Sequence, residues 1–270
     1  MRRLAPALVL GLTLACGAMP AQGQMLPPQL LDSTRPTQGD SIRACVDDDS
    51  PGGPLDRAVA QAIGDALFLD VDFVPALRGF PLDGDGYLAE MEIHLNNDCD
   101  LFMGIAVQPN SPFPEWAAMT RPYAQVPFVL VVADPDYRSL GDIPLGSTIG
   151  TAVASLGERV FITSMLQRPR EERWRRLPYA DFDLMTTRLL DGSLEGMLLW
   201  QPAWVRIAEQ NAAASHLRII PLDPVPQAVV QVGALISSYD TFLRTEVDAA
   251  IGALAADGTL DAILGDLGLD

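Results

Sequence analysis

The side chains that could bind a ligand follow the ends of predicted strands. Asp47 and Asp48 come directly after one apolar run, and Trp200 ends another. Parallel strands end at one edge of a sheet, and open α/β folds bind ligands at that edge. We therefore predict a cleft for a ligand or a protein partner at this edge. The residues assigned to it are Asp47, Asp48, Gly104, Ile105, Ser155, Trp200 and Gln201.

No catalytic group of residues emerges from the sequence. A Ser-His-Asp triad would need His94 or His216, which are the two histidines, and no Gly-x-Ser-x-Gly turn accompanies them. The basic residues are all arginines, which excludes a Schiff-base lysine and the lysine of a phosphate-binding P-loop. We therefore expect a protein that is not an enzyme and has no cofactor.

One group of acidic residues could collect a hard cation. The run 47–49 could join Asp83 and Asp85 around a calcium ion, which needs several carboxylate oxygens. Residues 83–86 resemble half a calcium loop, but no Glu follows at the twelfth loop position. We expect a solvated acidic rim here and no metal site.

Strand and helix patterns alternate from about residue 41 onward. Apolar residues between Leu55 and Leu67 recur at steps of three and four, which predicts a helix with one apolar face. The predicted order is strand 42–46, helix 55–67, strand 71–74, helix 87–95 and strand 100–107. This alternation is typical of a parallel sheet covered on both faces.

The same order occurs a second time in the chain. After an apolar run at 126–132, the prediction is strand 147–151, helix 155–166, strand 177–179, helix 184–190 and strand 197–200. A further apolar run at 228–236 precedes two closing helices. The sequence therefore predicts an α/β protein with two βαβαβ lobes that are joined by two crossing segments.

The amino terminus has the composition of a secretory signal. Arg2 and Arg3 precede the apolar run 4–15, and small residues at 21 and 23 predict cleavage before Gln24. We predict a signal peptide at residues 1–23 and a flexible leader, rich in Pro, Gln and Thr, at 24–40. The alternative is lipid attachment at Cys16, although its lipobox is poor.

The charge and hydropathy of the 270-residue chain point to the periplasm. The formal net charge is −17, and no stretch beyond the signal is apolar for long enough to span a bilayer. The run 170–176 carries arginines and glutamates at helical spacing, which favours a solvated helix face. We expect an exported, periplasmic protein with no membrane span and no nucleic-acid partner.

Cys45 and Cys99 remain after removal of the signal, and an exported chain favours a disulfide between them. Strand register argues against it. If strands 42–46 and 100–107 are adjacent and parallel, the offset between the cysteines exceeds the roughly 7 Å over which Cα atoms can be bridged. Two buried thiols are the default interpretation, and the bridge remains an open alternative.

The order of elements resembles family 3 of the extracellular solute-binding proteins, and so do two segments. These are Leu-Gly-Asp-Ile-Pro-Leu-Gly-Ser-Thr-Ile-Gly at 140–150 and Ala-Ala-Asp-Gly-Thr-Leu-Asp-Ala-Ile-Leu at 255–264. The resemblance implies the two-lobed periplasmic binding protein type II fold. Lobe 1 would comprise residues 41–127 and 228–270, and lobe 2 residues 128–227.

The positions that grip an amino acid in that family differ in this chain. Its amino-acid-binding members carry an Arg after the third strand and an Asp after the fifth. Here the stretch 107–115 has no Arg, and Trp200 and Gln201 stand in place of the Asp. Because both charged contacts are missing, we do not expect tight binding of a free amino acid.

Three local motifs are similar to a narrower family, the binding-protein-like accessory of quinoprotein methanol and alcohol dehydrogenases. They are Arg43-Ala44-Cys45-Val46-Asp47, Cys99-Asp100-Leu101-Phe102-Met103-Gly104-Ile105 with Thr120-Arg121-Pro122-Tyr123, and Leu199-Trp200-Gln201-Pro202. Gln201 departs from that family, which usually has Gly there. So does the loop 48–53, which lacks the Asn-x-Pro-Phe-Ser type segment.

The narrower resemblance implies a non-catalytic accessory or maturation factor whose partner is a quinoprotein, PQQ-dependent dehydrogenase. The alternative is an ABC-importer receptor for a small polar or cationic solute, whose partner is a membrane permease. In that alternative the solute lies between Asp47, Asp48, Ser155 and Trp200.

Overall fold

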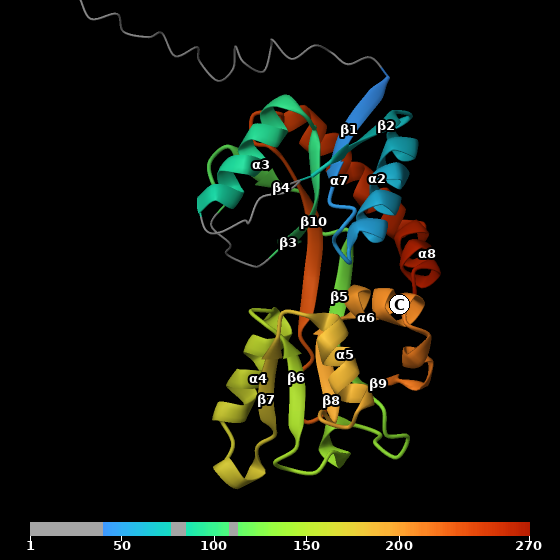
Figure 1. The fold of residues 1–270 in the computed structure, drawn as a ribbon. Helices are drawn as coiled ribbons and strands as arrows, with labels where there is room; N and C mark the ends of the chain where they lie inside the picture. Colours follow the sequence, from blue (N-terminus) through green and yellow to red (C-terminus); the bar gives the residue numbers. More distant parts are fainter. Residues whose placement is uncertain (1–39, 77–84, 108–112) are drawn as a thin grey trace, which may run out of the picture. The chain divides into compact units, whose positions relative to one another are not determined.

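Residues 40–76, 85–107 and 113–270 are described by a computed structural model of the protein (Figure 1). The predicted signal peptide, nearly all of the predicted leader, and Asp83 lie outside these residues. In the described part of the chain, no helix is long and apolar enough to cross a membrane.

The first half of the chain forms the predicted parallel strands and the helices between them. The elements are β1 (Ser41–Val46), α2 (Gly53–Leu67), β2 (Asp70–Pro75), α3 (Asp85–Asn97), β3 (Leu101–Val107) and the short β4 (Ala117–Met119). Strand β1 pairs in parallel with both β2 and β3. Figure 1 shows α2 beside α7 (Thr241–Ala256), and both pack against this sheet.

The second half repeats the pattern. Its elements are β6 (Thr148–Ala152), α4 (Leu156–Leu166), β7 (Arg175–Tyr179), α5 (Phe182–Leu190), β8 (Gly196–Trp200), α6 (Gln201–Gln210) and β9 (Arg218–Ile220). The last helix, α8 (Thr259–Asp266), follows α7 and packs with it against α2 of the first half. Strand β6 pairs in parallel with β7 and β8. The helix α6 was not predicted.

The two predicted crossing segments are the long strands β5 (Ala124–Val132) and β10 (Val229–Ser237). They pair antiparallel, β10 also borders β3, and β5 also borders β8. The strand order is therefore β2-β1-β3-β10-β5-β8-β6-β7. This architecture confirms the predicted α/β class and its two-lobed arrangement, while the exact lobe boundaries remain a prediction.

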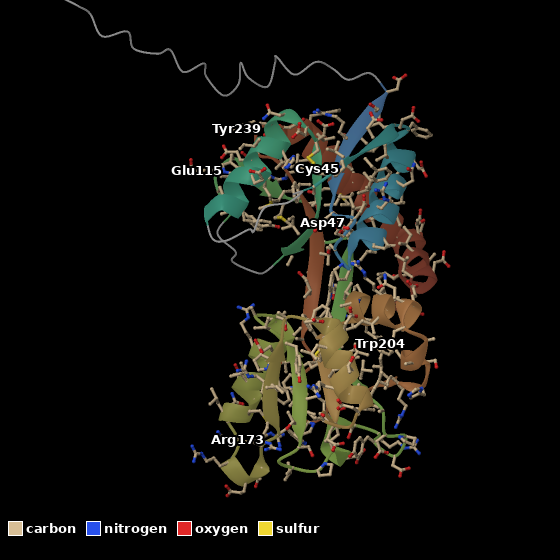
Figure 2. All side chains as sticks on the ribbon, in the orientation of Figure 1. Cys45, Asp47, Glu115, Arg173, Trp204 and Tyr239 are labelled. Carbon is tan, nitrogen blue, oxygen red and sulfur yellow. A yellow bond between two sulfur atoms is a disulfide. The ribbon has the colours of Figure 1, made fainter. Side chains whose placement is uncertain are left out.

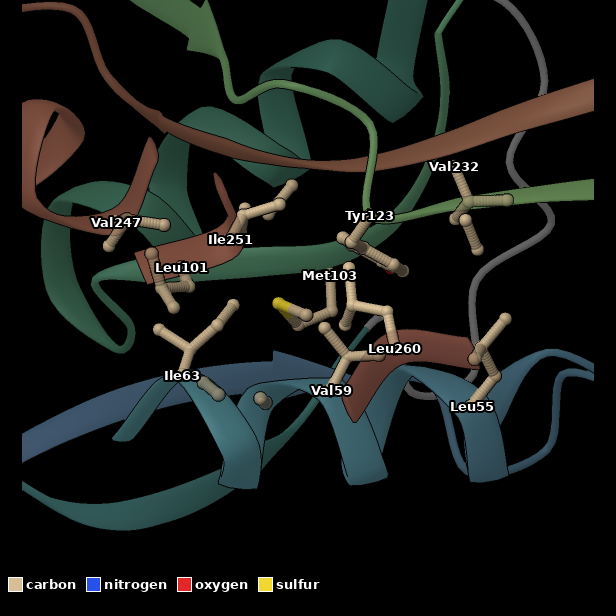
Figure 3. Packing of buried hydrophobic residues seen from close by; sticks show 14 of the residues in the cluster. Leu55, Val59, Ile63, Leu101, Met103, Tyr123, Val232, Val247, Ile251 and Leu260 are labelled. Carbon is tan, nitrogen blue, oxygen red and sulfur yellow. The ribbon is translucent and has the colours of Figure 1, made fainter. Parts of the chain in front are cut away.

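Two of the larger apolar clusters contain opposite ends of β5, with Ala124 and Val126 in one and Leu130 and Val132 in the other. One contains the apolar face of α2 with Leu101, Met103 and Tyr123 (Figure 3). The other contains Phe128, Ile149 and Phe161. The first cluster also contains Val247 and Leu260 of the carboxyl-terminal helices, so each core belongs to a lobe and not to one half of the chain.

The default interpretation of the cysteines was wrong, because Cys45 and Cys99 form a disulfide with their Cα atoms 5.6 Å apart. Strand β3 begins only at Leu101, whose neighbour is Ala44. Cys99 lies in the turn after α3, where its N–H is bonded to the carbonyl of His94. A straight strand was assumed at Cys99, and this turn instead brings it back beside β1.

The predicted helix face at 170–176 was also wrong. A 3-10 turn covers only Arg170–Glu172, and β7 begins at Arg175. The side chain of Arg176 pairs with Glu158, at 2.6 Å, and not with Glu172. The chain leaves the 3-10 turn before it enters β7, so the helical i,i+4 geometry that these pairs need is absent.

Candidate functional site

The first turn of α2 carries a carboxylic acid on the buried face of the helix. Gly52 caps the helix, Pro54 occupies its first turn, and Asp56 follows with only 4% of its surface exposed. Asp56 precedes Val59 by three residues and Ile63 by seven, so helical periodicity places its side chain on the same face as theirs. A carboxyl at such a position is costly unless a partner is present.

Asp56 has one hydrogen-bond donor. The Tyr123 hydroxyl donates to Asp56 Oδ1 at 2.5 Å, and the same hydroxyl accepts from the N–H of Gly104 at 2.9 Å. Tyr123 reaches from the start of β5 into the cluster that contains Val59 and Met103 (Figure 3). Within the described ranges no donor reaches Asp56 Oδ2.

Two glycines lie close to Asp56 Oδ2. Gly104 has a φ of +80°, and a methyl group on it would lie 2.4 Å from Asp56 Oδ2. A methyl group on Gly52 would lie 3.7 Å from the same oxygen and 2.9 Å from Cη2 of the Trp200 ring. The free carboxyl oxygen and the edge of an aromatic ring therefore flank the same point beside Gly52.

The burial of this carboxyl changes its titration. The pKa of Asp56 is raised from 3.8 to about 7: burial is the largest cause, the hydrogen bond from Tyr123 lowers it, and the negative charge of Asp47 raises it. Burial, together with the adjacent carboxyl of Asp56, raises the pKa of Tyr123 well above its ordinary value of 10. Asp56 therefore changes its protonation near neutral pH, while Tyr123 stays a donor.

Trp200 lies at the end of β8 and packs against both apolar clusters. Its indole Nε1 is buried and, in the described part of the chain, has no acceptor. A buried donor without a partner costs about 1–3 kcal/mol. That Trp200 contacts a ligand stays a prediction. The Trp200 ring lies beside Gly52, and this places it near Asp56.

Ser155 and its neighbours form the turn between β6 and α4. The Ser155 hydroxyl accepts from the N–H of Glu158 at 3.1 Å, so this serine is the N-cap of α4. The Glu158 carboxylate is 5% exposed and accepts from the N–H of Ala154 and from the hydroxyl of Thr151, both at 2.8 Å. Ser155 is thus the N-cap of α4, and the residue is half-buried.

The remaining predicted residues are placed as follows. Asp47, at the end of β1 (Figure 2), is half-buried and accepts from the N–H of Asp49 at 3.1 Å. Asp48 is exposed and makes a two-oxygen ion pair with Arg57, at 2.6 and 2.8 Å. An exposed pair of this kind contributes at most about 1 kcal/mol.

Ile105 and Gln201 point into the protein. Ile105 is buried in an apolar cluster with Cys45 and Phe102. Gln201 is 6% exposed and donates to the carbonyl of Gly268 at 3.0 Å, which ties α6 to the carboxyl terminus. The geometry therefore brings Gly104 and Trp200 to one point with Asp56 and Tyr123, which were not predicted as site residues.

A separate hollow of about 280 Å³ lies between the loop before α2, the helix α6 and the carboxyl-terminal residues. Asp48, Leu55, Pro202, Arg206 and Leu269 are among its lining residues. Among the described residues no group of three His, Cys, Asp or Glu side chains could hold a metal ion.

No protein-family model matches the chain, and no curated protein has a significantly similar sequence. Solved structures do match. The second substrate-binding domain of GlnP from Lactococcus lactis, in its open conformation, is 15% identical, with 86% of this chain and 96% of that chain covered and a TM-score of 0.65. The arginine-, lysine- and histidine-binding protein ArtJ from Geobacillus stearothermophilus is 18% identical, with 84% and 94% covered and a TM-score of 0.53.

An ancestral cationic amino acid solute-binding protein, AncCDT-1, is 16% identical, with 88% of this chain and 99% of that chain covered and a TM-score of 0.63. Another structure of AncCDT-1 describes it as a precursor of cyclohexadienyl dehydratase. At these identities the comparisons establish architecture and not ligand or activity. The described residues have the two-lobed fold of the type II periplasmic binding proteins.

Proposed function

We propose that the protein is a periplasmic receptor that binds a small polar or cationic solute and delivers it to an ABC permease. The single observation that carries this proposal is Asp56 Oδ2, an oxygen of a buried residue that receives no hydrogen bond from the described residues and is flanked by Gly52, Gly104 and the Trp200 ring. A carboxylate beside an aromatic ring suits an ammonium or guanidinium group. The architecture shared with solute-binding domains supports the same function.

Calorimetry with the exported protein at about pH 8 tests the proposal. The panel contains cationic, neutral and anionic solutes of similar size. We expect at least one cationic solute to bind, and Asp56→Asn to weaken that binding at least tenfold. Asp65→Asn is the matched control, because Asp65 lies on the same helix and is exposed.

Two results would overturn this assignment. One is the absence of binding by any cationic or neutral polar solute. The other is binding that Asp56→Asn leaves unchanged but Arg206→Ala abolishes, since Arg206 lines the hollow beside α6 and not the Asp56 site.

A second candidate function is the accessory role for a quinoprotein alcohol dehydrogenase. A specific observation favours it, because two of the motifs that carry that resemblance meet in space. Cys45 is bonded to Cys99, and the Gly104 N–H donates to Tyr123. Trp200 lies against Gly52, which belongs to the loop that departs from that family. The comparisons with solved structures add no support for a dehydrogenase partner.

Deletion of the gene separates the two candidates. The accessory role predicts impaired quinone-dependent alcohol oxidation with normal solute uptake, and binding of the cognate dehydrogenase that Trp200→Ala weakens by about 2 kcal/mol. The receptor role predicts impaired uptake of the solute with normal alcohol oxidation.

A further inference from the structure

The hydrogen bonds around Asp56 fix where its proton lies when the carboxyl is neutral. The Tyr123 hydroxyl donates to Asp56 Oδ1 at 2.5 Å and accepts from the N–H of Gly104 at 2.9 Å. Among the described residues, Asp56 Oδ1 is the acceptor of the hydroxyl proton. A second proton on Oδ1 would meet the hydroxyl proton across this short distance, so the proton of the acid form lies on Oδ2.

Asp56 Oδ2 is also the atom that a cationic solute would contact. It receives no hydrogen bond from the described residues, and Gly52, Gly104 and the edge of the Trp200 ring lie beside it. An ammonium or guanidinium group donates strongly to a charged carboxylate oxygen. A protonated Oδ2 presents a hydrogen to that group and carries no negative charge. The proton and the solute therefore compete for the same oxygen.

The surroundings of Asp56 make this competition effective near neutral pH. The residue is 4% exposed, and burial is the main cause that raises its pKa to about 7. The hydrogen bond from Tyr123 opposes that change, and the charge of Asp47 at the end of β1 adds to it. At pH 7 about half of the free protein thus carries the proton.

The other charged groups near α2 are paired or exposed. This helix packs against β1, β2, β3, α7 and α8. Arg57 is paired with Asp48, Arg43 of β1 with Asp100, and Arg206 of α6 donates to the carbonyl of Asp49. Asp248 of α7 accepts from the N–H of Arg121. The exposed charged residues on α2 and on the loop and elements around it are Asp49, Asp65, Asp70, Asp72, Arg244, Glu246, Asp261 and Asp266. Within the described ranges, no arginine is paired with Asp56, so the solute would be its cationic partner.

We propose that binding of the solute cation releases the proton of Asp56, so that the receptor is loaded at alkaline pH and emptied at acid pH. The exchange balances, because a neutral carboxylic acid and a cation give a carboxylate paired with the cation and one proton for the solvent. Tyr123 is the positioning residue that keeps the exchanged proton on Oδ2. This inference rests on the proposed receptor function and names the regulation of its site.

Calorimetry at about pH 5, 6 and 8 tests the coupling, with agmatine as the first cation and then the rest of the cationic panel. Amines and guanidines keep their protons throughout this range, so a released proton comes from the protein. We expect the Kd to be about a hundredfold higher at pH 5 than at pH 8. Two buffers with different enthalpies of ionisation should report about 0.9 protons released per solute at pH 6 and about 0.1 at pH 8.

The outcomes separate the coupling from the receptor function. A cation that binds with the same Kd at pH 5 and 8, and without proton release at pH 6, would overturn the inference and leave the receptor standing. The absence of binding by every cation at each pH would overturn both.

Variants assign the proton to Asp56 and the positioning to Tyr123. Asp56→Asn should weaken binding and make the Kd independent of pH. Tyr123→Phe removes the donor to Oδ1, which raises the pKa of Asp56, so the midpoint of the curve of Kd against pH should move to higher pH. Asp65→Asn, at an exposed position on the same helix, should reproduce the wild-type curve.

Each variant can also contradict its assignment. A wild-type pH dependence in Asp56→Asn would place the exchanged proton on another group and overturn the inference. An unmoved midpoint in Tyr123→Phe would remove Tyr123 from it. Thermal melting checks that each variant is folded.

Discussion

Asp56 and Glu158 are two buried carboxyl groups of the same protein with opposite surroundings. Glu158 accepts three hydrogen bonds from side chains and backbone of its own lobe, and their sum lowers its pKa. Asp56 accepts one, from Tyr123, and burial raises its pKa to about 7. Both residues are largely buried, at 4% and 5% exposure, but Glu158 has three donors, one of them the charged Arg176, where Asp56 has Tyr123 alone among the described residues.

The comparison separates a carboxyl that holds the fold from one that is available to a ligand. A charged group whose donors are all supplied by the protein stabilises a local structure, here the β6–α4 turn. A carboxyl oxygen to which the protein supplies no donor can accept a hydrogen bond from a ligand. A solute would therefore gain the most binding free energy from a contact with Asp56.

The largest expected effect is on stability as a function of pH. The unfolded chain loses the Asp56 proton near pH 4 and the folded chain near pH 7, so the folded state holds the extra proton between these values. This contribution is complete below about pH 4 and is lost as the pH rises to about 7, with a total on the order of 4 kcal/mol.

Urea unfolding at several pH values between about 4 and 8 measures this effect. Relative to wild type, Asp56→Asn should become more stable by up to about 4 kcal/mol as the pH rises through this range. Asp65→Asn should show no such trend. Parallel curves for wild type and Asp56→Asn would mean that Asp56 is charged in the folded protein, and the contrast with Glu158 would be lost.

The next effect is a loss of stability on removal of Glu158. Glu158→Ala leaves the fully buried Thr151 hydroxyl and the Ala154 N–H without their acceptor, and we expect a loss of about 3 kcal/mol at neutral pH. Urea unfolding checks it, with the exposed Glu171→Ala as a control that should change stability by less than about 0.5 kcal/mol. A loss below about 1 kcal/mol would show that Glu158 does not hold the turn.

The smallest effect concerns the single donor of Asp56. Tyr123→Phe removes that donor and the acceptor of the Gly104 N–H, and we expect a loss of about 1 kcal/mol near pH 7. It should also raise the pKa of Asp56, which moves the steep part of the stability curve to higher pH. Tyr137→Phe is a control at a more exposed hydroxyl. An unmoved curve would contradict the role given to Tyr123.

The repeated strand and helix order could be predicted because it depends on local patterns. Ser155 illustrates this, since a serine before an apolar helical run predicts a cap and the hydroxyl does cap α4. The same rule that placed Pro54 in the first turn of α2 could have found α6, where Pro202 precedes the buried residues Ala203, Trp204 and Ile207. Trp204 is seen on α6 in Figure 2.

Part of the candidate site could also have been predicted from the sequence. Asp56 interrupts the apolar face of a helix whose period was recognised, and a carboxyl at such a place needs a partner or a ligand. Its actual partner, Tyr123, is 67 residues away and could not be read from spacing. Arg176 likewise pairs with Glu158 across β6, not with a neighbour in sequence.

The contact between Trp200 and Gly52 gives the protein an internal optical probe. Trp174 and Trp204 are buried in the second half of the chain, and Trp116 packs half-buried against the cluster of Cys45 and Phe102. The Trp200 ring is half-buried beside the point where a solute would meet Asp56. Indole emission depends on the polarity and hydrogen bonding of its surroundings. We expect a bound solute to shift the emission of Trp200, so that unlabelled compounds can be screened by fluorescence alone, with Trp200→Phe as the silent reference.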